Sequence, residues 1–204
     1  MGSLAHWILA RWPSGKNEKT ENFESELEYY LNDREIILRL PVHIRDAWRN
    51  VKNKKILFDL MMKFARSDTG IEIRNNIKNI KREYRFNIKL NKTSMAGAID
   101  AFYGNTLIDY KLTSVNDAPE GLYESQLDFY ALAAHELTGL DEIRTVAVFL
   151  REGISKERIC NDFEGIKARV LGASEKCASG DLPPELKSCV KCPFAKKCAF
   201  SIRN

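Results

Sequence analysis

The sequence lacks any long apolar run and any strong excess of charge of one sign. No stretch approaches the roughly 18 consecutive apolar residues of a membrane helix, and the first residues do not form a basic segment followed by an apolar one. We therefore expect a cytoplasmic protein without membrane contact. Lysine and arginine number 32 against 28 aspartate and glutamate residues, a formal net charge of +4. This small excess permits binding to a polyanion without establishing it, because clustering matters more than net charge.

Cysteine is also scarce, but it is unevenly distributed. The chain has five cysteines, an odd number, and three lie within the last sixteen residues. Cys189, Cys192 and Cys198 form a Cys-x2-Cys-x5-Cys run, which is too polar and too tightly spaced for three core thiols and is typical of metal ligation. Zinc would need a fourth donor for tetrahedral closure, and an iron–sulfur cluster would be incomplete with three thiolates. The run predicts a zinc or iron–sulfur site in a reducing compartment.

The first eighty residues have the spacing of helices. Residues 4–12 form an amphipathic run that ends at Pro13, because proline cannot continue a hydrogen-bonded turn. Apolar residues recur at helical spacing over residues 23–31 and again after Asn53. We predict a mainly helical region over residues 1–80.

The apolar pattern then changes to a period of two. Residues 84–90 alternate apolar and polar side chains, as in a half-buried strand, and turn-forming residues 91–94 follow. Residues 96–103 and 106–113 are two further strand-like runs, joined by a Gly-Asn pair that favours a tight hairpin. Three sequential strands predict an antiparallel meander.

A second helical and apolar pattern completes the core. Residues 122–137 contain strong helix formers without an internal breaker, which predicts a helix lying against the sheet. Residues 143–150 are almost continuously apolar, as in a strand covered on both faces, and residues 159–176 are predicted to be helical. We expect a single domain over residues 1–204, with an α/β core at 81–176 and a cysteine-bearing tail at 177–204.

Two acidic residues and a lysine are the candidate catalytic groups. Asp109 and Lys111 are two residues apart in the third predicted strand, so both point to one face. Asp100 is expected to share a face with Ala98 and Phe102, where a carboxylate is costly unless it is paired or bound to metal. Carboxylate oxygens bind Mg²⁺ or Mn²⁺, and a nearby cation suits developing negative charge, so the trio fits phosphodiester hydrolysis. By itself, an Asp and a Lys two apart more often belong to a solvated face.

Four short motifs occur in one order along the chain. They are Gly-Ser-Leu-Ala-His at residues 2–6, Gly-Ala-Ile-Asp at 97–100, Asp-Tyr-Lys at 109–111 and Gln-Leu-Asp-Phe-Tyr at 126–130. The set resembles the Gly-x-x-x-His, Gly-x-x-Asp, Asp/Glu-x-Lys and Gln-x-x-x-Tyr motifs of the RecB-like branch of the PD-(D/E)XK nuclease superfamily, which includes the Cas4 and AddB nucleases. The resemblance implies an α/β fold: a restriction-endonuclease-like core with a mixed sheet, a central antiparallel meander and flanking helices.

The resemblance also implies roles for individual residues. The implied ligands of Mg²⁺ or Mn²⁺ are His6, Asp100, Asp109 and the carbonyl oxygen of Tyr110. Lys111 is implied to position or activate water, while Gln126 and Tyr130, which share one helix face, are implied to hold DNA. His43 and His135 match no motif, and we expect them to be structural or surface residues.

The cysteine run departs from the pattern of this family. In RecB-like nucleases it joins a cysteine upstream of the Gly-x-x-x-His motif to hold a [4Fe–4S] cluster, and no cysteine precedes Gly2 here. Three alternatives stay open: the fourth ligand lies in a removed N-terminal portion, Cys177 or Cys160 replaces it, or the cluster is absent. His6 lies so close to the first residue that we expect the domain to have been excised from a longer polypeptide, such as a helicase–nuclease.

We predict a divalent-metal-dependent deoxyribonuclease, an exonuclease on single-stranded or unwound DNA ends in repair, recombination or DNA processing, with a helicase on the same or a partner polypeptide. The alternative is a catalytically inert nuclease-fold module that binds DNA or serves as a scaffold in a helicase–nuclease complex. Retention of Asp100, Asp109 and Lys111 in a partly apolar site argues against it. A zinc-knuckle nucleic-acid-binding protein is a third interpretation, which explains only the tail.

Overall fold

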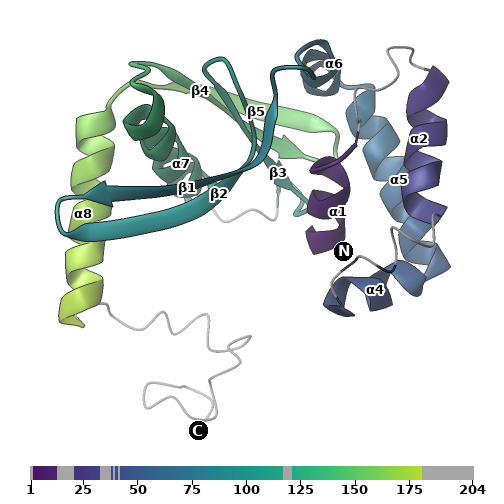
Figure 1. Cartoon of the computed structure of the whole chain (residues 1–204), viewed down its shortest axis with the longest axis horizontal. Helices are drawn as coiled ribbons and strands as arrows, with labels where there is room; N and C mark the ends of the chain where they lie inside the picture. The colour runs from purple at the N-terminus through teal and green to yellow at the C-terminus, as the bar shows by residue number, and fades with distance from the viewer. Residues whose placement is uncertain are drawn as a thin grey trace, which may run out of the picture.

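The computed structural model describes residues 2–12, 21–32, 38, 40, 42–116 and 121–180. The helices that precede the sheet are α1 (Gly2–Leu9), α2 (Glu21–Asn32), α4 (Val42–Arg49), α5 (Val51–Ala65) and α6 (Asp68–Asn75). The later elements are β1 (Lys81–Leu90), β2 (Thr93–Tyr103), β3 (Thr106–Lys111), α7 (Leu122–Thr138), β4 (Ile143–Phe149), β5 (Ile154–Cys160) and α8 (Phe163–Ser179) (Figure 1). The predicted meander and the helix α7 are thereby confirmed, and the described residues before β1 are mainly helical.

The five strands form one mixed sheet in the order β1-β2-β3-β4-β5. The pairs β1–β2, β2–β3 and β4–β5 are antiparallel, whereas β3 and β4 are parallel. A parallel pair needs a crossover, and α7 supplies it between β3 and β4. The sheet and its flanking helices are consistent with the PD-(D/E)XK nuclease fold that the motifs implied.

Helices cover both faces of the sheet and create two cores. The first core joins the early helices, α1 to α6, to Ile108 and Tyr110 of β3 and to Val146 and Val148 of β4. The second core joins α7 and α8 to the opposite side chains of the sheet, such as Leu107. Figure 1 shows these two helical layers. The predicted alternation of β3 is confirmed, since Ile108 and Tyr110 face the first core, whereas Lys111 pairs with Asp109 and contacts Gln126 of α7 on the other face.

One strand was missed from the sequence and one helix was predicted to start too early. Residues 159–160 were predicted to open a helix, but they end β5, and α8 begins at Phe163 after the N-cap Asp162. The side chain of Asp162 accepts a hydrogen bond from the Gly165 amide at 3.0 Å. β5 is an edge strand with mostly exposed polar residues, so its sequence carries no apolar alternation.

Strands β2 and β3 diverge beyond a short paired stretch. β2 pairs with β3 only over 101–103, whereas it pairs with β1 along its length. Residues 84–99 of β1 and β2, with their turn, therefore extend past β3; we call this segment the outer hairpin. The fork between β2 and β3 begins at Asp100.

The alternation of side chains reverses at the fork. Ile99 packs in the second core and Ala101, two residues on, packs in the first. Asp100 lies between them, and Glu83, opposite in register, has a positive φ of 48°. This irregular pair turns the outer hairpin relative to the rest of the sheet. The expectation that Asp100 shares a face with Phe102 was wrong for this reason, because Phe102 packs with Ile99 on the side of α7.

Within the described residues, no helix is long and apolar enough to cross a membrane.

Candidate active site

His6 reaches the fork from α1. The helix buries Leu4, Ala5, Ile8 and Leu9 in the first core, which fixes its rotation. The side chain of His6 is 35% exposed, and its Nδ1 lies 3.1 Å from Oδ1 of Asp100. This hydrogen bond raises the pKa of the imidazole above its ordinary value.

Asp100 links the two strands that separate at the fork. Its Oδ2 accepts a hydrogen bond of 2.8 Å from the Tyr110 amide, and its Oδ1 faces His6. The backbone of β2 no longer pairs with β3 at this level, so the carboxylate satisfies an amide that would otherwise lack a partner on that side. The structure thus brings Asp100 next to His6 and to the strand that carries Asp109 and Lys111.

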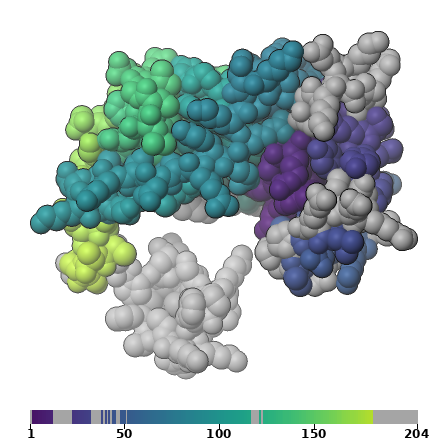
Figure 2. Space-filling model, viewed as in Figure 1, coloured from purple at the N-terminus to yellow at the C-terminus, as the bar shows by residue number. Residues whose placement is uncertain are grey.

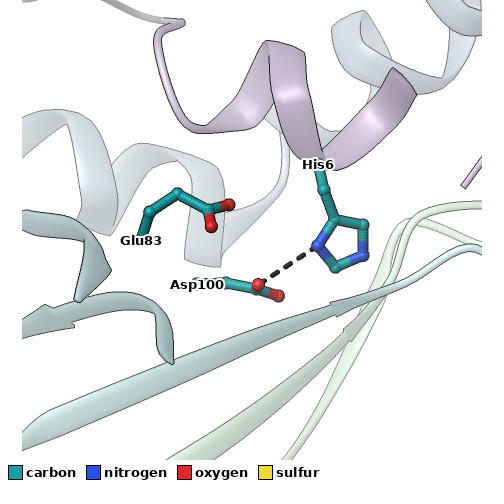
Figure 3. Close-up of side chains that lie close together, drawn as sticks. All are labelled: His6, Glu83 and Asp100. Atoms are coloured by element: carbon teal, nitrogen blue, oxygen red, sulfur yellow. Dashed lines mark hydrogen bonds and ion pairs between the residues drawn. The ribbon is translucent and has the colours of Figure 1, made fainter. Parts of the chain in front are cut away.

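Glu83 is a candidate ligand that the sequence did not reveal. It lies opposite Asp100 on β1, and Figure 3 shows its carboxylate near the imidazole of His6 and the carboxylate of Asp100, below α1. One ligand atom from each of the three residues lies within 4.8 Å of the others, a spacing that can hold a metal ion. Glu83 stands in a run of charged residues, and nothing in its spacing distinguishes it from a solvated strand residue.

Lys111 is held by a chain of polar side chains on the α7 side of the sheet. Its Nζ lies 2.7 Å from Oδ2 of Asp109 and donates a hydrogen bond to Oε1 of Gln126. Nε2 of Gln126 in turn donates to the Tyr130 hydroxyl at 2.9 Å. Gln126 and Tyr130 thus share one face of α7, as their spacing predicted; they contact each other, and Gln126 contacts the lysine.

The carboxylate of Asp109 is buried with an incomplete set of partners. The residue is 3% exposed, and burial, followed by the charge of Asp100, raises the pKa of Asp109. Its Oδ2 faces the ammonium of Lys111 but accepts no hydrogen bond of normal geometry from the described residues. A buried carboxylate oxygen in this state, next to a second acid, suits a site for a divalent cation.

A glycine and three aromatic rings position α7 against the outer hairpin. A Cβ at Gly97 would lie 2.6 Å from the ring of Phe86, so the glycine leaves room for that ring across the strand pair. Phe86 packs edge-on against Phe129 and Tyr130 at centroid distances of 5.5 and 6.0 Å. Gly97 of the Gly-x-x-Asp motif therefore contributes to the position of Tyr130, because it leaves the space in which Phe86 packs against that tyrosine.

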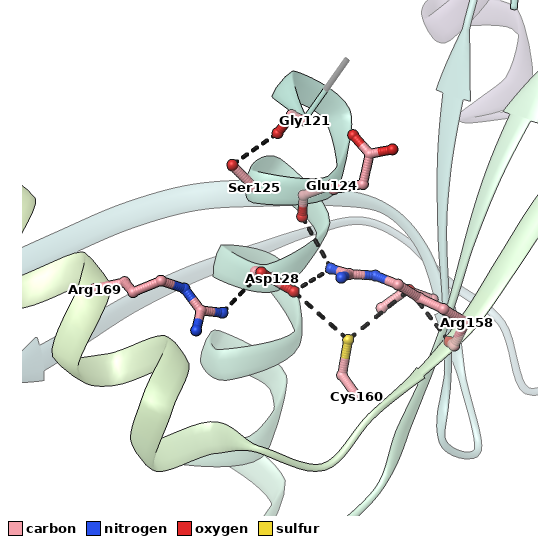
Figure 4. A network of polar contacts seen from close by, with 8 residues as sticks. Gly121, Glu124, Ser125, Asp128, Arg158, Cys160 and Arg169 are labelled. Atoms are coloured by element: carbon pink, nitrogen blue, oxygen red, sulfur yellow. Dashed lines mark hydrogen bonds and ion pairs between the residues drawn. The ribbon is translucent and has the colours of Figure 1, made fainter.

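Ion pairs at Asp128 anchor the same helix on its other side. Arg158 of β5 and Arg169 of α8 both contact the Asp128 carboxylate, and Arg158 also donates to the Glu124 carbonyl at 3.0 Å (Figure 4). The buried thiol of Cys160 lies 3.8 Å from Asp128. Asp128 sits between Gln126 and Tyr130 in sequence, so the contacts fix the turn that carries both.

The other predicted ligands and histidines are placed as follows. Cys189, Cys192 and Cys198 lie outside the described residues, as does the side chain of His43. Cys177 is exposed near the end of α8, whereas Cys160 is buried. His135 is structural, as expected: it stacks on Phe163 at 4.1 Å, and its Nδ1 lies 2.8 Å from the Leu140 carbonyl oxygen.

The match to a known protein family covers nearly the whole chain. The family model of the PD-(D/E)XK nuclease superfamily matches residues 1–199, so the chain belongs to this superfamily, whose members are typically metal-dependent nucleases. Among solved structures, it is similar to the crystal structure of SSO0001, with 15% identity and a TM-score of 0.45 over 90% of this chain and 98% of that chain. No curated protein matches the chain.

Proposed function

We propose that this chain hydrolyses phosphodiester bonds in DNA at the fork between β2 and β3. The observation that carries the proposal is the meeting of two groups there: the ligand set of His6, Glu83 and Asp100, and the buried pair of Asp109 and Lys111. The carboxylates of Glu83, Asp100 and Asp109, together with the imidazole of His6, would hold Mg²⁺ or Mn²⁺. When bound, such a cation lowers the pKa of water and stabilises charge on the phosphate.

The side chains of the site have separable tasks. Asp100 and Asp109 supply negative charge, and their side chains are 14% and 4% exposed. Lys111 places an ammonium where charge develops during attack on phosphorus, and its contacts with Asp109 and Gln126 fix the position of Nζ. Tyr130 fixes Gln126 in turn. We therefore assign Gln126 and Tyr130 a positioning role, beside the DNA contact implied by their motif.

Finer features of the activity follow from the motif set. The order of the four motifs supports membership of the RecB-like branch and an exonuclease acting on single-stranded or unwound DNA ends, in repair or recombination with a helicase partner. For the cysteine run, Cys177 is the candidate fourth ligand within this chain, because its thiol is exposed whereas that of Cys160 is buried in the second core. A [4Fe–4S] cluster or zinc would then join the tail to the end of α8.

A cleavage assay tests the activity and its polarity together. Single-stranded and blunt duplex DNA, labelled at either the 5′ or the 3′ end, would be incubated with Mg²⁺, Mn²⁺ or EDTA. We expect cleavage with a divalent cation and none with EDTA, and stepwise shortening of single strands in preference to duplex. DNA binding without cleavage under every metal condition would contradict the proposal and support the inert nuclease-fold module instead.

A further inference from the structure

A groove runs alongside the candidate metal ligands, between α1 and the outer hairpin. Its volume is 750 Å³, which falls within the range of small-molecule sites. The groove is lined by Trp7 of α1, by Arg11 just past the end of that helix, and by Arg85 of β1, and it reaches the candidate ligands His6, Glu83 and Asp100. It is therefore continuous with the proposed reaction centre, and beside the carboxylates of Glu83 and Asp100 its lining carries two guanidinium groups and one large aromatic ring.

Trp7 and Arg11 form a stacked surface in this groove. The guanidinium of Arg11 lies 4.2 Å from the centroid of the Trp7 ring, and its Nη1 donates to the Trp7 carbonyl at 3.0 Å. Trp7 is half-buried, whereas Trp12 and Trp48 are each 1% exposed. Aromatic rings and guanidinium planes are the groups on which unstacked bases rest.

The open face of the outer hairpin continues the groove away from the metal ligands. On β1, Phe86 and Ile88 face the second core, while the intervening Arg85, Asn87 and Lys89 are exposed. Arg85 and Lys89 are about 14 Å apart at the usual rise of a strand, room for more than one phosphate. Figure 2 shows the hairpin at the front of the molecule, beside α1.

The strand opposite these cations carries small side chains. Ala98, Ala96 and Ser94 of β2 pair with Arg85, Asn87 and Lys89 and lie on the same face. This face of the outer hairpin therefore has small side chains on β2 and basic side chains on β1. An extended polyanion fits this arrangement better than an apolar partner does, since the face offers cations and little apolar surface.

We propose that the groove and the open face of the outer hairpin bind one unpaired strand of nucleic acid beside the scissile phosphate. Trp7 and Arg11 stack a base, and Arg85 and Lys89 contact two separate phosphates of the same strand. The inference deepens the proposed function, since the bound strand leads to the cluster of His6, Glu83 and Asp100. We propose that the groove binds single strands in preference to duplexes, because a base within a duplex is already stacked and cannot stack on Trp7.

The test is binding in EDTA, where no cleavage is needed for a signal. Titration with an oligo-dT strand should quench the tryptophan emission of the wild type, and Trp7→Phe should remove that quench, because the two other tryptophans are buried. The Arg85→Ala/Lys89→Ala variant should bind more weakly, with the slope of log K against log salt reduced by about 1.4, or 0.7 for each lost phosphate contact. Lys55→Ala, at an exposed position on α5, is the matched control and should keep the wild-type slope.

Three outcomes would overturn the inference. They are an unchanged salt slope in the double variant, a full quench in Trp7→Phe, and equal affinity for duplex and single strands. Circular dichroism would verify that each variant is folded, and Arg85→Gln would replace the alanine variant if it is not. Because binding is measured without metal, a failure of cleavage would leave these results interpretable, and a failure of binding would leave the cleavage assay standing.

Discussion

Glu83 combines a strained backbone with a ligand position. Its φ of 48° is unusual for a residue with a side chain. Glu83 lies beside Asp100, where the alternation of side chains along β2 reverses. Residues held in such conformations cluster at functional sites, where the surrounding structure maintains them. The strain in β1 thus accompanies the placement of a third ligand next to His6.

Two substitutions separate the strain at Glu83 from its charge. We expect Glu83→Gly to be more stable than Glu83→Ala by about 1 kcal/mol in EDTA, the reverse of the usual order within a strand, because only glycine adopts positive φ freely. Both variants should bind Mn²⁺ at least about tenfold more weakly than the wild type. Thermal denaturation and titration calorimetry measure the two effects. An alanine variant as stable as the glycine variant, or wild-type affinity for Mn²⁺, would contradict the assignment.

The hydroxyl of Tyr130 tests whether α7 positions the lysine or holds DNA. Tyr130→Phe removes the acceptor for Gln126 and leaves the ring packing intact, so we expect kcat to fall about tenfold, with KM and Tm little changed. Steady-state kinetics measures this split. Tyr84→Phe, at another half-buried tyrosine packed against the second core, is the control. A rise in KM at constant kcat would instead support a role limited to DNA contact.

At the scale of elements, α7 is the part whose position decides the geometry of the lysine. It is fixed by Phe86 on one side and by the ion pairs of Asp128 on the other. Asp128→Asn should lower the free energy of unfolding by about 1–2 kcal/mol, because the carboxylate is largely buried between two guanidinium groups. Arg169→Ala should cost less than about 0.5 kcal/mol, since Arg169 is 62% exposed. Urea denaturation measures the free energy of unfolding of both variants. Equal losses in the two variants would show that Arg169, and not Arg158, is the main partner of Asp128.

The sequence predicted the elements that have a regular apolar period and missed those that do not. β3 and α7 were predicted with their functional faces because a period of two and a spacing of four are visible in the residues. β5 was missed because an exposed edge strand has no such period. The reversal at Asp100, and with it the role of Glu83, depends on pairing between β1 and β2 and on one backbone angle, which no local pattern encodes.

At the scale of the whole molecule, the early helices are joined to the sheet by a polar network as well as by the first core. Glu72 of α6 forms a two-pronged contact with Arg144 of β4, at 2.6 and 3.0 Å, and accepts a hydrogen bond from Tyr103 of β2 at 2.8 Å. Arg144 also pairs with Glu157 of β5. The hydrogen bond from Arg144 lowers the pKa of Glu72 below its ordinary value of 4.5.

This network predicts a pH-dependent contribution to stability. Since the pKa of Glu72 is lower in the folded protein, its contribution is fully present above pH 4.5 and is lost as pH falls through the folded value. We expect Glu72→Gln to lower Tm by about 2–4 °C at neutral pH, with the difference from wild type shrinking as pH falls below 4.5. Thermal melts across pH measure this, with Glu175→Gln at an exposed position as the control. A difference that is constant with pH would show that the charge of Glu72 does not carry the effect.

The proposed nuclease activity depends on the pair of Asp109 and Lys111 acting at the fork between β2 and β3. The most direct measurement is the rate of single-stranded DNA cleavage with Mn²⁺ by wild type, Asp109→Asn and Lys111→Ala. We predict metal-dependent cleavage by the wild type and a loss of at least about a hundredfold in each variant, with circular dichroism and DNA binding retained. Cleavage by either variant at the wild-type rate, or wild-type cleavage that persists in EDTA, would contradict the assignment of this site.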